Sequence, residues 1–205
     1  MKQILVEYIP FVISQHQINE SLKENNGRLI VKGVLQRAES KNQNGRIYPR
    51  TILEREIKKY SSTNIAQRRA LGELDHPDSQ IVNLSNVSHN IIEVKWNSDD
   101  VVGTIEILNT PAGKILKELF EAGITLGISS RGMGSVKKID ENTVEVQDDF
   151  ELVAWDFVSN PSTHGAFMAP INEASLMGMI PHVINKYDKV NSIITDILIS
   201  QTSKF

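Results

Sequence analysis

The sequence predicts an α+β fold, with a β-rich body and few helices. Strand-like stretches, short and apolar, outnumber the stretches with helical spacing. Turn residues separate these stretches, and Ser98-Asp99-Asp100 divides two of them in the manner of a hairpin. No internal repeat is present. These three observations favour one mixed domain over a helical bundle or a repeat array.

The predicted strands follow from runs of apolar and β-branched residues. Residues 87–97 and 101–108 flank the turn and form the clearest pair. The run at 124–129 leads into the glycine-rich sequence SSRGMGS, which we expect to be a turn. The remaining predicted strands are residues 28–38, 136–139 and 143–158.

Helical spacing marks three further segments. Residues 51–60 place Ile52, Leu53, Ile57 and Tyr60 on one face. The next helix has Thr110 as its N-cap, Pro111 in its first turn and Gly123 just past its end. Its expected apolar stripe is Ile115, Leu116, Leu119 and Phe120, and residues 183–200 form a third, amphipathic helix candidate.

The polar segments divide the chain into an arm, a body and a tail. Residues 14–27 are polar and poorly periodic, so we expect a loose N-terminal arm over 1–27. Loops are expected at 40–49 and 61–86. The body then spans 28–170, and a C-terminal helical segment spans 171–205.

Composition bounds the function. The 205 residues can bury a real core, and 22 Lys+Arg against 25 Asp+Glu give a net charge of −3, which argues against a nucleic-acid partner. Cysteine is absent, which excludes disulfides, thiolate catalysis and Cys-ligated zinc. The longest apolar runs fall short of the roughly 20 residues of a membrane helix. We therefore expect a soluble protein with no membrane partner, used inside a cell.

The first candidate for chemistry is His76 in the loop sequence GELDHPDS. Pro77 restricts the backbone of His76, and a rigidly held histidine is a good general base because its pKa lies near neutrality. A surface histidine in a turn is the plainer interpretation. An alternative with lower weight is a metal site of Asp75, His76, Asp78 and His89, although this spacing matches no standard zinc pattern.

The second candidate is the sequence GISSRGMGS, residues 127–135. A serine after a buried strand and before a glycine-rich turn resembles the way nucleophilic serines are displayed, with N–H groups near a developing oxyanion. Arg131 adds a fixed positive charge. A nest that binds an anion is the rival interpretation, and a plain turn is the simplest one.

The third candidate is Asp156, which interrupts the apolar run LVAWDFV. A carboxylate between Trp155 and Phe157 is costly to bury unless it is paired. It could orient a catalytic histidine, as a triad acid does, or it could face solvent at a strand end.

Taken together, the motifs resemble those of the prohead core (maturation) proteases of large contractile-tailed bacteriophages. The matching sequences are NGRIYPRTILEREIKKY, GELDHP, DDVVGTIEIL, GISSRGMGS and DFELVAWDFVSNPS, in this order over about residues 28–170. The resemblance implies a serine protease with a herpesvirus-assemblin-like fold, a β-barrel surrounded by helices. It implies no metal and no organic cofactor.

The resemblance also implies roles for individual residues. His76 would be the general base and Ser129 the nucleophile, with Ser130 as its competitor, since a one-residue shift along a strand reverses the side chain. Assemblin-like enzymes use a second His as the third member, but here the corresponding segment departs from that pattern and offers Asp156, which is the expected third member. His89 and His164 are the reserves. Backbone N–H groups of Ser130–Gly132, helped by Arg131, would hold the oxyanion or contact substrate.

Substrates and location follow from the same resemblance. The expected substrates are phage scaffold and other head proteins, cut after Glu in a Leu/Ile-x-Glu context inside the immature prohead in the host cytoplasm. This chain carries that tripeptide in its outer segments, so we expect self-processing at Glu20 or Glu24 and at Glu173. A homodimer or higher oligomer is also expected. The alternative function is a non-catalytic capsid-assembly or scaffold-binding module of the same fold.

Overall fold

The structure is a computed structural model that describes residues 3–11, 14–77, 79–159 and 168–170. Within these ranges the chain forms mostly strands and a few helices, and no helix there is long and apolar enough to cross a membrane. The helical segments are α1 (Gln15–Glu24), α2 (Arg50–Tyr60), a π-helical turn (Ser61–Ile65), a 3₁₀ turn (Leu84–Asn86) and α3 (Pro111–Glu121). The strands are β1 (Gln3–Phe11), β2 (Leu29–Arg37), β3 (Arg46–Ile47), β4 (Leu71–Glu73), β5 (Val87–Asn97), β6 (Asp100–Ile107), β7 (Leu126–Gly134), β8 (Val136–Asp140), β9 (Thr143–Val146), β10 (Glu151–Val158) and β11 (Met168–Pro170).

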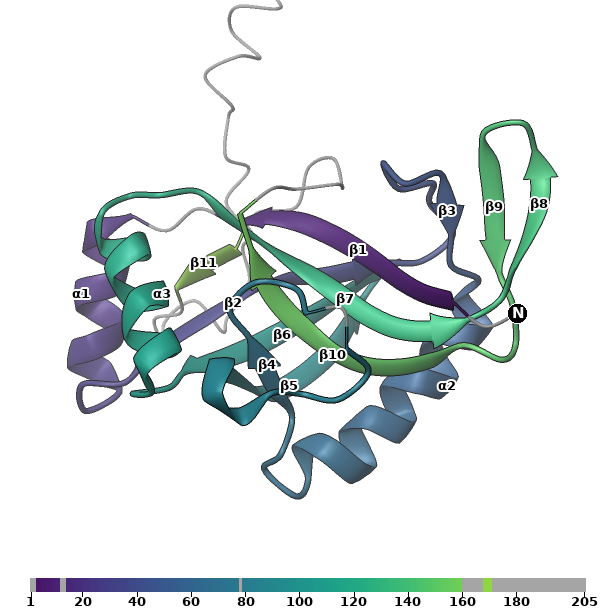
Figure 1. The fold of residues 1–205 in the computed structure, drawn as a ribbon. Helices are drawn as coiled ribbons and strands as arrows, with labels where there is room; N and C mark the ends of the chain where they lie inside the picture. The colour runs from purple at the N-terminus through teal and green to yellow at the C-terminus, as the bar shows by residue number, and fades with distance from the viewer. Residues whose placement is uncertain (1–2, 12–13, 78, 160–167, 171–205) are drawn as a thin grey trace, which may run out of the picture. The chain divides into compact units, whose positions relative to one another are not determined.

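A curved sheet of three strands, in the order β1-β7-β10, carries the sequence GISSRGMGS at its centre (Figure 1). β7 pairs antiparallel with β1 on one side and with β10 on the other. In this register Ser129 lies opposite Tyr8 on one neighbour and Asp156 on the other. The strand with the candidate nucleophile is therefore paired on both sides.

A second sheet has the order β11-β2-β6-β5-β4, and β8, β9 and β3 form a small third sheet. The second sheet meets the first where β4 ends. Leu74 forms an isolated parallel bridge with Phe157, and the N–H of Asp75 donates to the carbonyl of Phe157 at 2.7 Å. These contacts bring the chain just before His76 against β10.

The expected helices α2 and α3 are confirmed. Thr110 caps α3 by accepting from the N–H of Gly113, and Pro111 occupies the first turn. Gly123 follows with φ 73°, a conformation that glycine adopts without strain. All four predicted apolar residues of α2 are buried, whereas Ile115 of the α3 stripe is exposed.

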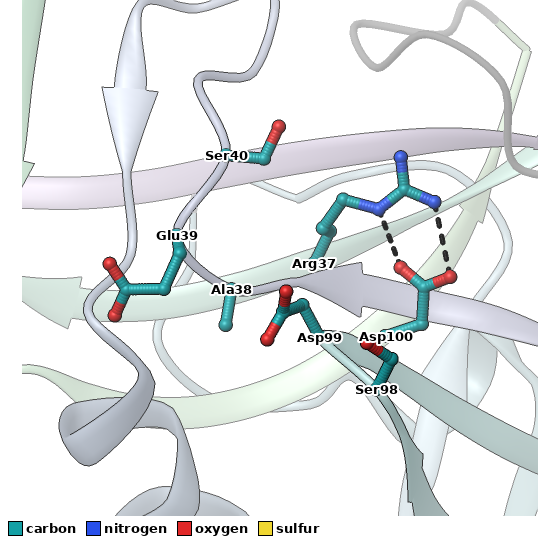
Figure 2. Close-up of a pocket in the computed structure, with 7 residues that line it drawn as sticks. All are labelled: Arg37, Ala38, Glu39, Ser40, Ser98, Asp99 and Asp100. Carbon is teal, nitrogen blue, oxygen red and sulfur yellow. Dashed lines mark hydrogen bonds and ion pairs between the residues drawn. The ribbon is translucent and has the colours of Figure 1, made fainter.

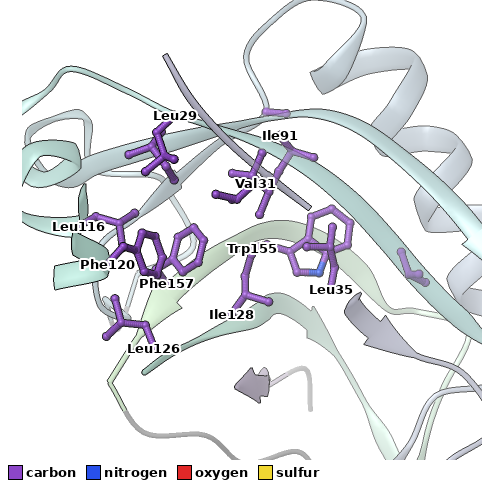
Figure 3. Packing of buried hydrophobic residues seen from close by; sticks show 14 of the residues in the cluster. Leu29, Val31, Leu35, Ile91, Leu116, Phe120, Leu126, Ile128, Trp155 and Phe157 are labelled. Carbon is purple, nitrogen blue, oxygen red and sulfur yellow. The ribbon is translucent and has the colours of Figure 1, made fainter. Parts of the chain in front are cut away.

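The main core lies between the strands of the two large sheets and the helices that cover them (Figure 3). Fully buried Trp155 packs edge-to-face on Tyr60 of α2, with ring centroids 4.9 Å apart. Phe157 packs in the same manner on Phe120 of α3. The side chains of Trp155 and Phe157 thus face the core. Because side chains alternate along a strand, the side chain of Asp156 lies on the opposite face of β10.

The prediction of a loose arm at the N-terminus is wrong for the residues described. Residues 3–11 form β1, which is paired along β7. Ser14 and Gln17 form a capping box that starts α1, and Ile18 of that helix is completely buried. Polar composition hid this helix because only a narrow face contacts the core.

Other expectations also need correction. Residues 61–86 are not one loop, since they contain β4, whose three residues are too few for an alternation pattern. The glycine-rich sequence at 130–134 is strand and not turn. Residues 143–158 form two strands, β9 and β10, and the predicted helix at 183–200 lies outside the described residues.

Candidate active site

His76 reaches the site from a turn that follows β4. Asp75 adopts a left-handed backbone conformation, φ 70°, which aspartate tolerates better than most residues, and its Oδ1 accepts from the N–H of His76. The side-chain amide of Asn86 donates to the carbonyl of Leu74 and secures the start of this turn. The imidazole is thereby directed toward β7 and β10.

Ser129 and Asp156 are held by the pairing of β7 with β10. The two residues are register partners, so their side chains lie on the same face of the sheet. Nε2 of His76 lies 2.7 Å from Oγ of Ser129, and Nδ1 lies 2.9 Å from Oδ2 of Asp156. The structure therefore brings together the three residues that the sequence singled out.

The partners of His76 determine its tautomer. An ionised carboxylate only accepts hydrogen bonds, so Nδ1 carries the proton that is donated to Asp156. Nε2 is then free of a proton and accepts from the hydroxyl of Ser129. This is the tautomer in which a histidine can remove a proton from a serine.

The adjacent Ser130 points away from this arrangement. Strand alternation places its side chain on the opposite face of β7, where it is buried. Its Oγ has no hydrogen-bond partner among the residues described. The geometry distinguishes the two serines, and only Ser129 contacts His76.

Asp156 is buried but fully partnered. Its carboxylate accepts from the N–H of Glu73 at 2.9 Å, from His76, and from Nε and Nη2 of Arg131 at 2.8 and 3.3 Å. Burial raises the pKa of this carboxyl, but the bonds from His76, Arg131 and Glu73 together leave the pKa below its ordinary value. Asp156 is therefore an anion at neutral pH.

Arg131 requires a correction. Its side chain was expected at the oxyanion or the substrate, but it is 1% exposed and bridges two buried carboxylates, Asp156 and Glu73. Its Nη1 also donates to the carbonyl of Ser79. The guanidinium thus lies behind the acid and is not available to an acidic substrate residue.

The expectation that backbone N–H groups of Ser130–Gly132 hold the oxyanion stays a prediction. These residues lie in a strand that is paired on both sides, where N–H groups bind neighbouring strands. A glycine-rich turn would have left such groups free for an oxyanion. The ladder of β7 with β10 is interrupted at these residues, because its register shifts between Leu152 and Ala154, opposite Gly132 and Arg131.

Sequence reasoning missed Glu73, which completes the buried cluster. Its Oε1 accepts from Nη2 of Arg131 at 2.9 Å and from the N–H of Asn83 at 3.0 Å. Glu73 is three residues before His76 in the sequence GELDHP. The motif contained this residue, but only the pairing of β4 shows that Glu73 is buried.

His89, a reserve for the third triad position, has a different environment. It is completely buried, Nε2 donates to the carbonyl of Trp155 at 2.9 Å, and Nδ1 accepts from the hydroxyl of Ser88. Burial lowers its pKa to about 4, and nearby Asp156 and the bond to Trp155 offset only part of this effect. His89 therefore supports β10 as a neutral residue and does not contact His76.

The structure does not bring the remaining candidate residues into a site within the described ranges. Within the described ranges no group of three or more His, Asp or Glu side chains could hold a metal, and Asp78 lies outside those ranges. His164 and Glu173 also lie outside them. Glu20 and Glu24 belong to α1, so the loose backbone expected around them is not present.

A shallow hollow of about 280 Å³ lies at the ends of β2 and β6 (Figure 2). Arg37 and Asp100 form an ion pair across it, with Nε and Oδ1 2.5 Å apart. None of its lining residues belongs to the cluster around Asp156. The lining residues are Arg37, Ala38, Glu39, Ser40, Ser98, Asp99 and Asp100.

A serine, a histidine and a buried carboxylate connected in this order are the arrangement that serine hydrolases use for acyl transfer. Comparison with known proteins agrees with this class. Residues 5–176 match the model of the prohead core protein serine protease family, and the chain belongs to that family.

Two relatives define the similarity further. The chain is 31% identical over 170 residues to the prohead core protein protease of Enterobacteria phage T4, covering 81% of this chain and 78% of that protein. The solved structure of the bacteriophage T4 capsid assembly protease is similar with a TM-score of 0.67 and 29% identity, covering 78% of this chain and 99% of that one. The resemblance inferred from the motifs is thus confirmed, and the chain is a phage capsid maturation protease.

Proposed function

We propose that the chain is a serine endopeptidase in which Ser129, His76 and Asp156 form the catalytic triad. The observation that carries this proposal is the imidazole of His76, which bonds Ser129 through one nitrogen and Asp156 through the other. The alternative of a non-catalytic scaffold-binding module gives no reason for both contacts. Family membership and geometry therefore support the same conclusion.

The proposed chemistry is two-step acyl transfer. Oγ of Ser129 attacks the scissile carbonyl while Nε2 of His76 takes the hydroxyl proton, and that proton then passes to the leaving amine as the C–N bond breaks. Water, deprotonated by His76, releases the acyl group and restores Ser129. Asp156 keeps the ring oriented and stabilises the imidazolium that forms in each step.

Access to the nucleophile is a second element of the proposal. Ser129 is 0% exposed, and the side chain of His76 is 19% exposed. A substrate carbonyl can reach Oγ only after neighbouring chain moves. We propose that the described conformation is a closed form and that the site opens when the enzyme acts.

The proposed substrates are phage scaffold and head proteins inside the immature prohead, cut after Glu in a Leu/Ile-x-Glu context. The basis is the family and the similarity to the T4 relative, a capsid assembly protease. Self-processing at Glu173 would release residues 174–205 as a propeptide or docking segment. Glu20 and Glu24 are weaker candidates because a protease needs an extended backbone and both lie in α1.

Two structural expectations accompany this function. We propose an assemblin-like barrel, which is supported by the bridge from Leu74, just after β4, to Phe157 of β10 and by contacts between β1 and β2. Backbone hydrogen bonds between β1 and β2 in a crystal structure would test closure. We also propose a dimer or higher oligomer, which light scattering of the purified full chain would test.

The deciding experiment is intact mass over time for wild type, Ser129→Ala and Ser130→Ala, each with a synthetic peptide of residues 166–180. This peptide contains Ile171-Asn172-Glu173. We expect cleavage after Glu by wild type and by Ser130→Ala only. Cleavage by Ser129→Ala would refute the assignment, and loss of cleavage in Ser130→Ala alone would transfer the nucleophile to Ser130.

A further inference from the structure

The buried cluster behind His76 contains one cation and two carboxylates. Arg131 donates twice to Asp156 and once to Glu73, and each of the three side chains is at most 1% exposed. Oε1 of Glu73 accepts from two donors, the N–H of Asn83 and the guanidinium of Arg131, and the second contact is an ion pair. The cluster therefore carries one net negative charge while His76 is neutral.

This charge balance matters for a triad acid. An aspartate paired with an arginine forms a neutral unit, and a neutral unit stabilises a nearby imidazolium less than a free carboxylate does. Arg131 alone would thus weaken Asp156 as the partner of His76. A second carboxylate on the same guanidinium restores the negative charge.

Resting on the proposed function, we propose that Glu73 is a positioning residue of the active site. Its negative charge compensates the positive charge of Arg131. The negative charge of Asp156 therefore remains available to stabilise the imidazolium of His76. Glu73 acts through Arg131 and Asp156, since none of its described hydrogen bonds is to His76 itself. When Ser129 gives its proton to His76, the buried cluster with its imidazolium becomes neutral overall. A neutral buried group avoids the desolvation penalty of an uncompensated charge.

The other titratable groups around the cluster do not alter this balance near pH 7. Tyr60, on α2, has a pKa raised chiefly by burial, and His89, on β5, has a pKa lowered to about 4, so both are neutral. Asp75 precedes His76 in the turn and accepts from its N–H, but it is exposed and therefore screened by water. The charge at Asp156 is thus set by Glu73 and Arg131.

Glu73 also has a structural role that must be separated from its charge. Its Oε1 accepts from the N–H of Asn83, which fastens the loop after His76. In Glu73→Gln the amide oxygen can keep both bonds of Oε1. The amide nitrogen would replace Oε2, which is buried without a hydrogen-bond partner among the described residues. Glutamate and glutamine at position 73 would therefore each leave one buried polar atom unpaired. The substitution therefore removes the charge and preserves the shape.

Glu56 provides a matched control. It is a buried glutamate that pairs with Arg55 at 2.9 Å and accepts from the N–H of Leu152 on β10 at 3.0 Å. It therefore resembles Glu73 in burial, in its arginine partner and in its bond to backbone. No contact joins it to Asp156 or His76 among the interactions described.

The test is an NMR titration of the His76 ring in the full chain carrying Ser129→Ala, which prevents self-cleavage. We expect Glu73→Gln to lower the pKa of His76 by about one unit, because a nearby negative charge favours imidazolium. Glu56→Gln should leave that pKa unchanged. Arg131→Gln should move it in the opposite direction, upward.

Glu73→Gln decides the question, and Arg131→Gln, for which the opposite shift is expected, checks that the charge of the cluster acts on His76. An unchanged or raised pKa of His76 in Glu73→Gln would overturn the proposal, as would an unchanged or lowered one in Arg131→Gln. The titration needs no proteolysis. Cleavage by Ser129→Ala would refute the proposed function but would not change the result of the titration. An unchanged pKa of His76 in Glu73→Gln, together with normal cleavage by wild type, would refute only the role of Glu73.

Discussion

Nδ1 of His76 lies 2.9 Å from Oδ2 of Asp156, although 80 residues separate the two in the chain. Two features of the backbone produce this contact. The turn at Asp75 is bound to β10 through the carbonyl of Phe157, and the register of β10 with β7 places Asp156 beside Ser129. The acid therefore orients the ring from the same sheet that carries the nucleophile.

Replacing Asp156 with Asn tests this orientation. The amide can donate to Nδ1 and so favours the wrong tautomer of His76, in which Nε2 carries the proton and cannot accept from Ser129. We expect kcat for peptide cleavage to fall by about 10⁴-fold with little change in KM. Steady-state kinetics with the peptide of residues 166–180 would measure this, and a loss below tenfold would remove Asp156 from the triad.

Buried His89 should make the stability depend on pH. In the unfolded chain a histidine titrates near 6.5, whereas the folded pKa is about 4. The unfolded state therefore binds a proton first as the pH falls, so folding stability decreases from pH 6.5 to about 4, by up to about 3 kcal/mol. No such penalty acts above pH 6.5.

Urea unfolding at pH 7, 5.5 and 4 would measure this decrease. His89→Gln is the matched variant because its amide can still donate to the carbonyl of Trp155 without titrating. We expect the free energy of unfolding to fall less in the variant over this range. Parallel curves for the two proteins would show that another group causes the acid sensitivity.

Gly72 should tolerate no side chain. A Cβ at this position would lie 2.0 Å from the carbonyl oxygen of Trp155 and 2.2 Å from Nε2 of His89. Both atoms are buried and form a hydrogen bond with each other, so a shift of either atom would cost free energy. We expect Gly72→Ala to reduce stability by about 3 kcal/mol or more.

Gly27 is the control for this substitution. It has φ 82° and open space around its missing Cβ, so Gly27→Ala should cost only the left-handed backbone strain, about 1 kcal/mol. Thermal unfolding of both variants would compare the two effects. Equal losses would mean that β4 and β10 can separate at Gly72 without penalty.

Self-processing should depend on Glu173 and not on the N-terminal glutamates. We expect Glu173→Gln to stop the loss of residues 174–205, because the enzyme is proposed to cut after Glu. Glu24→Gln should leave processing unchanged, since Glu24 ends the capped helix α1. Mass spectrometry of each chain after incubation would read this out, and a product that begins at residue 25 would contradict it.

Local patterns in the sequence predicted much of the fold. The apolar spacing of α2 and α3 and the cap of α3 specify helices within one segment, and the β5–β6 pair joins neighbours in the chain. The site residues His76, Ser129 and Asp156 were found by motif, because each lies in a distinctive short sequence. Such signals need no knowledge of distant contacts.

The tertiary structure alone decided which groups meet. Arg131 could have faced a substrate, but the pairing of β7 with β10 places it diagonally across from Asp156. Glu73 carries no sequence signal, since a strand of three residues shows no periodicity and its burial depends on β5 and β10. The sequence by itself determined α2, α3 and the candidate triad, whose signals are local, but not α1. Pairing between distant strands decided the charge balance behind the histidine.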